Sequence, residues 1–419
     1  MSDEPRKGKP RVAEPQRRQG VIRFEMPEDT LPVTHAARVL WDVVGTLELG
    51  AFLSKVKAIE GSAGRRTLSP RMKLTLWLYA ISNGVGSARE IERLVLSDDG
   101  YRWIVGDLEV SHHTLSSFRI EHGAALDQLM TDILAALLHK GVLSLALVAQ
   151  DGIRIRAAAT APSFRGIESL LECREQAALH LKATLANADD PELTQMQHSA
   201  RAAAARDFQR RVEEAISTVT ELQKARSPSD KPARASTTDA EARVMKMADG
   251  GFRPGFNVQM ATAGSPLGGA RTLVGVRVTN VGSDMGSITP MLDEIERRTG
   301  ALPTVLLADA NHAHHACIRT AAEQNVELLV AVPKRSRKPI SSNADIHPAI
   351  VAWRARMETG EAQTLYRARA SLCELSNAHL RTHHGVNEFL VRGLAKVTCV
   401  VLLAAITSNL LQHAAALLA

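Results

Sequence analysis

Three carboxylates in this chain have the types and positions needed to work on a metal ion. Asp151 follows the apolar segment 143–149, and Asp309 follows a second apolar segment, 304–308. A carboxylate at the end of a buried strand is costly to place unless a metal or another cation pairs with it. Glu374 lies in a helical pattern far downstream, and a third carboxylate completes an oxygen cage for hard divalent cations. Two such ions about 4 Å apart can activate an attacking oxygen and stabilise a leaving one at a phosphodiester.

A structural alternative exists for each of these residues. Gly152 allows the backbone to turn sharply, so Asp151 alone could simply cap a turn at the end of its strand. The chain has 45 acidic residues, so three of them at suitable positions are weak evidence by spacing alone. Arg367 and Arg381 on the predicted helix of Glu374 strengthen the case, because basic residues there would neutralise DNA phosphates beside the metal ions.

The elements that must position these carboxylates form an α/β pattern in the second half of the chain. Helices are predicted over 291–298 and from about 347 onward. The predicted strands cover 143–149, 153–156, 257–262, 273–281, 304–308 and 327–332. Acidic residues that end separate strands can meet at the carboxyl edge of one sheet. The predicted fold class of residues 141–419 is therefore α/β, a mixed sheet with flanking helices.

The first third of the chain is organised differently. Residues 1–24 are polar and rich in Pro, Arg and Lys, which predicts a disordered basic tail. Residues 25–140 have a helical pattern, which predicts an all-helical N-terminal domain. One helix ends at the turn 83–86, and a capping box from Ser87 to Glu90 begins the next helix. A third long helix is predicted from Thr114.

Two helices joined by a glycine turn fit a DNA-binding helix pair, although such pairs are common in many proteins. Basic side chains surround this predicted pair, and we expect residues 25–140 to bind DNA through them. They are Arg71, Lys73, Arg89, Arg93 and Arg119.

Two amphipathic helical patterns interrupt the α/β pattern over about 165–224, which predicts a helical hairpin inserted into the sheet domain. Neither apolar stripe would be stable alone in water, so we expect the two helices to pack on each other. The alternative is that Arg206, Arg210 and Arg211 reach DNA held by a second subunit.

Composition narrows the class of protein. A chain of 419 residues with 45% hydrophobic residues can form two or three domains, and its net charge of +6 favours an anionic partner such as nucleic acid. Four widely separated cysteines fit neither a zinc site nor a disulfide framework and suit a reducing cytoplasm. The uncharged segment 397–419 is interrupted by polar residues, which predicts a buried helix and no membrane span. No phosphate-binding loop is present, so we expect no nucleotide cofactor.

The histidines that follow Asp309 are a further candidate metal site. His312, His314 and His315 lie close together in the sequence. Adjacent histidines in a loop are usually polar surface residues, and we interpret these three in that way rather than as zinc ligands.

Several longer segments resemble bacterial insertion-sequence transposases of the DDE type, which have a ribonuclease-H-like catalytic core. The resemblance extends from about residue 25 to 415. The segments are LSPRMKLTLWLYAISNGVGSAREIERL, SHHTLSSFR, QDGIRIRAAAT, STTDAEARVMK with GGFRPGFNVQ, VLLADANHAHHACI and YRARASLCELSNAHLRTHHGVNEFLVRGLAKV. The last is the most specific, because it resembles the family's Tyr-x-x-Arg…Glu signature followed by Arg-Gly-Leu-x-Lys-Val.

The resemblance implies that Asp151, Asp309 and Glu374 bind Mg²⁺, for which Mn²⁺ can substitute. It also implies that Tyr366, Arg369 and Arg381 contact DNA near the cleaved end, and Arg392 and Lys396 in the last motif are further expected DNA contacts. The implied activity is cleavage of double-stranded DNA at the ends of the protein's own element, followed by joining to target DNA. We expect a homodimer or larger assembly on DNA in the bacterial cytoplasm, bound to the nucleoid.

Two residues depart from the pattern of the family. Asn311 stands where the family usually has Gly, and Asn tolerates the left-handed backbone. Arg381 stands where related groups often have Lys. The positive charge is kept, but a planar guanidinium replaces the compact ammonium group of lysine. Two alternatives remain: a catalytically silent DNA-binding remnant, and a nuclease of the same fold that only hydrolyses DNA.

Overall fold

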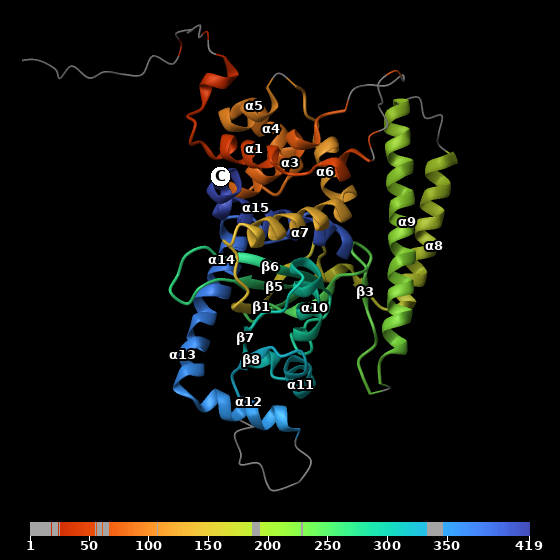
Figure 1. Ribbon diagram of the computed structural model, residues 1–419. Coiled ribbons are helices and arrows are strands. Elements are labelled where there is room, and N and C mark those ends of the chain that lie inside the picture. The colour runs from red at the N-terminus through yellow and green to blue at the C-terminus, as the bar shows by residue number, and fades with distance from the viewer. Residues whose placement is uncertain are drawn as a thin grey trace, which may run out of the picture.

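The structure is a computed structural model that describes residues 18, 24, 26–54, 56, 61, 67–106, 108–186, 193–227, 229–332 and 347–419. The predicted basic tail, 1–24, lies outside the described residues except for Arg18 and Phe24. Figure 1 shows a helical N-terminal region on one side of a mixed sheet, with a long helical hairpin standing beside both.

The N-terminal region is helical, as predicted, and packs around one apolar core. Its elements are η1 (Pro27–Thr30), α1 (Ala36–Gly45), α2 (Gly50–Leu53), α3 (Pro70–Ser82), α4 (Ala88–Ser97), α5 (Asp99–Val105), α6 (His112–Glu121) and α7 (Gly123–His139). The hydroxyl of Ser87 accepts a hydrogen bond from the backbone N–H of Glu90, so Ser87 begins α4 as predicted. The carboxylate of Glu90 bonds to Arg93 and does not complete the predicted capping box. The single long helix predicted from Thr114 is wrong, because α6 ends before His122, whose buried ring stacks on Phe52.

The sheet has six strands and is mixed. The strands are β1 (Leu147–Arg156), β4 (Arg243–Lys246), β5 (Phe252–Ala263), β6 (Thr272–Thr279), β7 (Val305–Ala308) and β8 (Glu327–Val330). The strand order is β4-β5-β1-β7-β8, and β6 also pairs with β5. β4, β5, β6 and β1 pair antiparallel, whereas β1, β7 and β8 are parallel. Helices flank this sheet, so the predicted fold class is confirmed.

The turn predicted at Gly152 is absent, because β1 continues through this residue and pairs with β5 from Val148 to Arg156. Gly152 serves another purpose. A Cβ atom at this position would lie 2.0 Å from Nε2 of Gln259 and 2.7 Å from Oδ1 of Asp284. A residue without a side chain is therefore needed here to make room for two polar side chains beneath the strand.

Helices cover both faces of the sheet. α10 (Ile288–Thr299) packs on β6 and β5, and α11 (His315–Glu323) packs on β8. The other face of β1, β7 and β8 is covered by consecutive helical segments. These are α13 (Gly360–Arg369), which follows α12 (Pro348–Glu358), then the π-helical turn η5 (Ala370–Glu374) and α14 (Leu375–Thr382).

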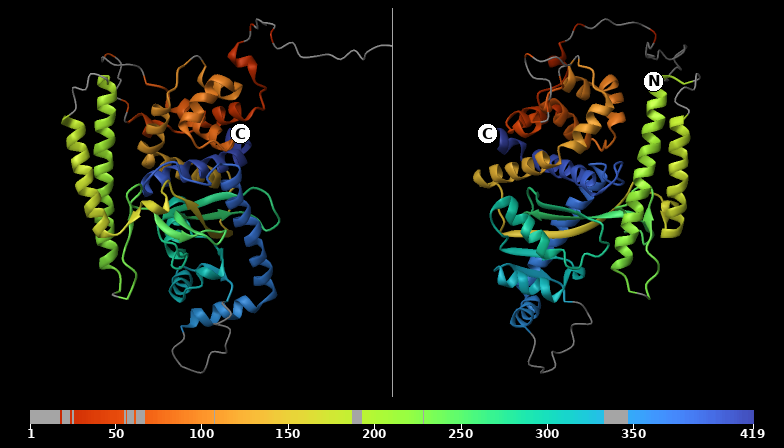
Figure 2. Two further views of the ribbon diagram at one scale, coloured as in Figure 1. Left: turned by 180° about the vertical axis from the view of Figure 1, so that it is seen from behind. Right: turned by 90° about the vertical axis from the view of Figure 1, so that its right-hand side faces the viewer.

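The last helix, α15 (Leu394–Leu418), lies between the N-terminal helices and the sheet (Figures 1 and 2) and contacts α3, α7 and β6. It is long and apolar enough to cross a membrane, with a mean hydropathy of 1.9, but 61% of that window is buried. The buried Asn409 bonds to both backbone groups of Leu273 in β6, at 2.8 and 2.9 Å. The polar residues that interrupt the apolar segment thus form hydrogen bonds with backbone groups at the edge of the sheet. α15 is therefore a core helix of this fold.

The hairpin is formed by α8 (Ile167–Ala186) and α9 (Gln195–Lys224), which pack on each other along the hairpin. A small sheet of β2 (Phe164–Arg165) and β3 (Ala235–Ser236), with η2 (Ala161–Ser163), joins the hairpin to the fold. Arg210 forms ion pairs with Asp207 and Glu214, and Arg211 forms one with Asp207, all on the same helix. These two arginines are therefore neutralised locally, which favours the packing interpretation over contact with DNA.

Candidate active site

The register of two parallel strands brings Asp151 and Asp309 level with each other. Leu147 pairs with Val305 and Ala149 with Leu307, and the same offset, continued by two residues, aligns Asp151 with Asp309. Side chains alternate along a strand, so Asp151 follows Leu147 and Ala149 on one face. That face carries a small apolar cluster shared with α13 and η5. The two carboxylates are therefore the first polar side chains beyond this apolar cluster.

The π-helical turn places Glu374 on the same side as Arg369. Residues five apart in an α-helix point in directions about 140° apart. The wider π-turn brings the two side chains closer in direction, and Arg369 Nη2 lies 3.5 Å from Glu374 Oε1. The side chain of Glu374 is 61% exposed. Glu374 thus lies at the open rim of the site, on the helical segment that covers the aspartates.

Arg369 is the cation that links these carboxylates. Its Nη1 atom is 4.0 Å from Oδ2 of Asp151, and its Nη2 atom contacts Glu374. The same Oδ2 atom of Asp151 accepts a hydrogen bond of 3.0 Å from the amide of Asn377 in α14. Tyr366 lies half-buried one helical turn before Arg369, and burial raises the pKa of its hydroxyl.

The turn η3 (Ala310–His312) holds Asp309. Oδ1 of Asp309 accepts a hydrogen bond of 2.9 Å from the backbone N–H of Asn311 and lies 2.6 Å from Nδ1 of His312. Oδ2 accepts a bond of 3.0 Å from the side-chain amide of Asn311. Asn311 therefore orients both oxygens of the carboxylate, from the position where the resemblance led us to expect Gly.

The two aspartates have opposite pKa shifts. Burial raises the pKa of Asp151, and the nearby charge of Asp309 adds to this, against the opposing effects of the Gly152 N–H and Arg369. Burial also acts to raise the pKa of Asp309, but hydrogen bonds from His312 and Asn311 and the charges of His312 and Arg369 lower it overall. Of these two carboxylates, Asp151 is therefore the more readily protonated as the pH falls.

A buried polar layer lies beneath the site, and the sequence did not reveal it. Nε2 of His312 is 3.5 Å from Oε1 of Gln259, and Nε2 of Gln259 donates to Asp284 at 2.7 Å. Asp284 in turn pairs with Arg154 at 2.5 Å. Our interpretation of His312 as a surface residue is wrong: its side chain is fully buried, because η3 folds it back under Asp309. Its spacing three residues after Asp309 was the available signal.

We expect His312→Ala to lower both Mn²⁺ affinity and DNA cleavage by about 10- to 100-fold, the usual cost of losing a group that orients a metal ligand. His312→Gln should restore part of the Mn²⁺ affinity, because its amide can still donate to Asp309. The matched control is His314→Ala, which removes an exposed neighbouring histidine. Isothermal titration with Mn²⁺ measures the effect, and an unchanged affinity in His312→Ala would refute the orienting role.

The site has the carboxylate oxygens that a hard divalent cation prefers as ligands, but these oxygens do not surround a common point. Within the part of the chain that the structure describes, no three His, Cys, Asp or Glu side chains form a group that could hold a metal ion. Asp151 and Asp309 supply adjacent carboxylate oxygens. The guanidinium of Arg369 lies beside Asp151, so a cationic group already occupies the space next to these carboxylates. Glu374 has to turn inward from the rim to become a third ligand.

Two of the basic residues expected to bind DNA in the N-terminal region belong to the core instead, which corrects the prediction for Lys73 and Arg119. Lys73 lies over the ring of Phe118, and burial lowers the pKa of its amine. Arg119 lies over the ring of Trp77 and donates to the carbonyl of Gly86 at 2.7 Å. These contacts hold both side chains against the core, which disfavours a contact with a DNA phosphate.

The remaining expected DNA contacts differ in exposure. Arg71 is half-buried, since its guanidinium bonds to the carbonyl of Trp41 and lies 4.2 Å from that ring. Arg381 is half-buried beside the η3 turn. The exposed members are Arg89, Arg93, Arg392 and Lys396. α3 is almost wholly buried, so α4, with Arg89 and Arg93, is the helix of the predicted pair that can face DNA.

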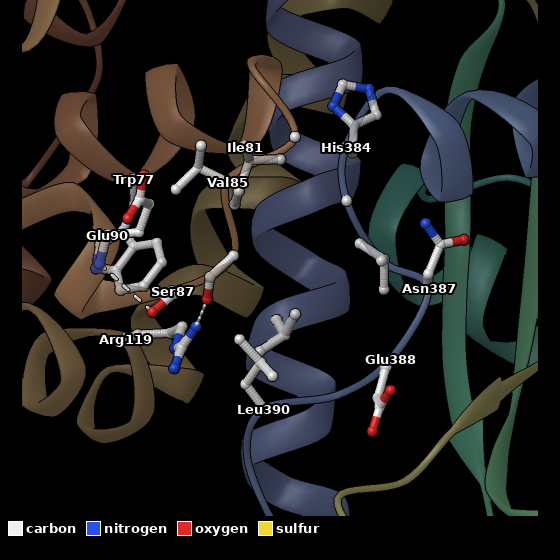
Figure 3. Close-up of a pocket in the computed structure, with 15 residues that line it drawn as sticks. Trp77, Ile81, Val85, Ser87, Glu90, Arg119, His384, Asn387, Glu388 and Leu390 are labelled. Atoms are coloured by element: carbon white, nitrogen blue, oxygen red, sulfur yellow. Dashed lines mark hydrogen bonds between the residues drawn. The ribbon is translucent and has the colours of Figure 1, made fainter. Parts of the chain in front are cut away.

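Arg119 also borders a cavity of about 370 Å³ between the N-terminal helices and the segment before α15. Figure 3 shows Trp77 and Arg119 on one side of this cavity and Asn387 and Glu388 on the other. Burial lowers the pKa of His384, another lining residue, to about 4. The cavity lies at the interface between the N-terminal helical region and the C-terminal part of the chain.

Comparison with protein families supports the expectation from the sequence. The model described as a transposase DDE domain matches residues 313–414, which include Glu374 and begin just after Asp309. A second model, described as a transposase domain, matches residues 26–121. No curated protein and no solved structure matches the chain. With the DDE match, the mixed sheet and its covering helices agree with a ribonuclease-H-like fold.

Proposed function

We propose that the chain, in which residues 313–414 match a transposase DDE domain and residues 26–121 match a second transposase domain, is an insertion-sequence transposase. It would cut DNA at the ends of its own element and join the freed 3′-hydroxyl to target DNA. The proposed metal is Mg²⁺, with Mn²⁺ as a substitute. We further propose that the protein acts on DNA as a homodimer or larger assembly, in the bacterial cytoplasm.

One observation carries the proposal: Asp151 and Asp309 lie level on adjacent strands, beneath the helical segment that bears Glu374. Asp151 and Asp309 would hold Mg²⁺, and Glu374 would join them after turning inward. When bound, the metal ions supply charge stabilisation for the attacking and leaving oxygens of the phosphodiester. Transfer of one phosphodiester to another conserves the bond, so the reaction needs no nucleotide cofactor.

The protein groups around the carboxylates have separate tasks. Asn377 and Asn311 orient Asp151 and Asp309 through the hydrogen bonds described above. Arg369 carries positive charge at the centre of the site and would move onto the phosphate that is cut. Tyr366 and Arg381, on either side of Glu374 in the sequence, would contact the DNA beside that phosphate.

The test uses the purified full chain with a duplex of the element's terminal sequence, joined to flanking DNA, and a target plasmid. We expect strand cleavage at the element's end in Mg²⁺, followed by products joined to the plasmid. DNA binding without cleavage would identify a catalytically silent remnant. Cleavage without joined products would identify a nuclease that only hydrolyses DNA.

A further inference from the structure

The outer helix of the inserted hairpin carries an apolar stripe that the fold leaves exposed. Residues of α8 recur at alternating spacings of four and three, which is the pattern of a coiled-coil contact surface. The six positions, here called the α8 stripe, are Ile167, Leu171, Arg174, Ala178, Leu181 and Leu185. All are apolar except Arg174. Ile167, Leu171 and Leu185 are 41%, 37% and 45% exposed, so a surface with the pattern of a helix contact meets solvent.

The second helix of the hairpin packs on a different side of α8. The buried residues of α8 are Leu170, Cys173 and Ala177, and Leu170 joins an apolar cluster with Ala215 and Val219 of α9. α8 is also the helix of the hairpin that lies farther from the sheet (Figures 1 and 2). A second molecule can therefore approach the α8 stripe without displacing α9.

Charged residues beside the α8 stripe change sign along the helix. Glu168, Glu175 and Lys182 are seven residues apart, and each directly follows a stripe position on the side away from α9. All three are exposed, whereas the ion pairs that the structure shows in the described part of the hairpin lie within α9. Acidic residues thus flank the first half of the stripe, and a basic residue flanks its second half.

A second copy of α8 in the antiparallel direction matches this distribution of charge. The first residue of the stripe then lies level with the last residue of the other stripe, and Lys182 of each copy lies level with Glu168 of the other. Arg174, near the centre, comes level with Glu175 of the second copy, which provides a partner for its charge. In a parallel, in-register pairing every charged residue would meet its own copy, and like charges that face each other are destabilising.

We propose that the α8 stripe is a contact between two copies of this chain, in which the hairpins pair antiparallel about a two-fold axis. The same surface is used on both copies, so the contact closes and forms a dimer rather than a filament. DNA is a poorer occupant, because the stripe is apolar and the carboxylates of Glu168 and Glu175 beside it repel phosphate. This inference rests on the proposed function for the assembly whose contact surface it names.

The first test measures self-association of the full chain by sedimentation velocity, without DNA or metal ions. We expect the wild-type protein to dimerise at micromolar concentrations. A variant with both Leu171→Ser and Leu185→Ser should weaken the dimer by at least about 100-fold, because four leucine side chains per dimer lose their apolar burial. Both leucines are exposed in a single copy, so the fold should persist, and far-UV circular dichroism checks this. The control is Leu267→Ser, which removes a 97% exposed leucine in the β5–β6 loop, outside the hairpin.

The second test reverses the charges beside the α8 stripe. Glu168→Lys and Lys182→Glu should each weaken the dimer by about tenfold at low salt, because two contacts per dimer change from attractive to repulsive. The two changes together should restore the wild-type affinity. Positions 168 and 182 are roughly 21 Å apart along one helix, so they cannot compensate each other within one copy.

A wild-type protein that stays monomeric, or a dimer that the leucine changes leave intact, would overturn the proposal. Single charge reversals that are not restored in the double variant would overturn it too, because antiparallel pairing requires compensation between copies. Cleavage of the element's terminal duplex in Mg²⁺ is scored separately for the wild-type protein. A chain that dimerises through the α8 stripe without cutting DNA would keep this contact and lose the proposed function, whereas a chain that cuts and joins DNA without this contact would do the reverse.

Discussion

Asp151→Asn, Asp309→Asn and Glu374→Gln are each expected to lower the rate of DNA cleavage by at least about 10³-fold, because the charge stabilisation supplied by bound metal ions is worth several kcal/mol. Each change removes one negative charge without changing the size of the side chain, so no cavity opens. Asp151 and Asp309 should show the larger losses, since their carboxylates lie side by side at the sheet edge.

Cleavage rates in Mg²⁺, together with the affinity for the element's terminal duplex, measure this effect. Affinity for the duplex should not fall, because a carboxylate repels phosphate and the neutral amide that replaces it does not. The matched control for Glu374→Gln is Glu358→Gln, an exposed glutamate in α12 that should cleave at the wild-type rate. A variant at one of the three positions with near wild-type cleavage would remove that residue from the proposed site.

Arg369→Gln is expected to have two effects of opposite sign. In the free protein the guanidinium lies 4.0 Å from Asp151 and 3.5 Å from Glu374, where it competes with a divalent cation. Its removal should tighten Mn²⁺ binding in the absence of DNA by about tenfold, since a like charge near the metal is lost. Cleavage should nevertheless fall by about 10²- to 10³-fold, the typical cost of losing one donor to the charge that develops in the transition state.

Isothermal titration with Mn²⁺ gives the first quantity, and cleavage at saturating Mg²⁺ gives the second. Arg367→Gln is the control for the Mn²⁺ titration without DNA, because Arg367 is an exposed arginine in the same helix that is not in contact with the carboxylates. If Arg369→Gln weakened Mn²⁺ binding as well as cleavage, the arginine would be needed to hold the carboxylates together. Its assignment as a competitor for the metal would then be wrong.

Periodicity and capping residues determined the local structure of this chain. The alternating and apolar segments predicted the main strands, Ser87 predicted the start of α4, and the polar interruptions after residue 397 predicted that α15 is buried. These features depend on residues that are close in sequence, and they act on the backbone within a few residues. The same local signal placed Asp151 and Asp309 beyond apolar segments, which is why they were candidates.

Which polar residues are buried and which carboxylates meet depends on contacts between segments that are distant in sequence. Arg119 is drawn into the core by Trp77, and His312 by Asp309 and Gln259. The desolvation cost of a charged side chain depends on the partner that meets it, and that partner is set by packing between distant segments. Local sequence patterns thus specify the elements and the residues available for chemistry, whereas long-range packing sets the neighbours of those residues.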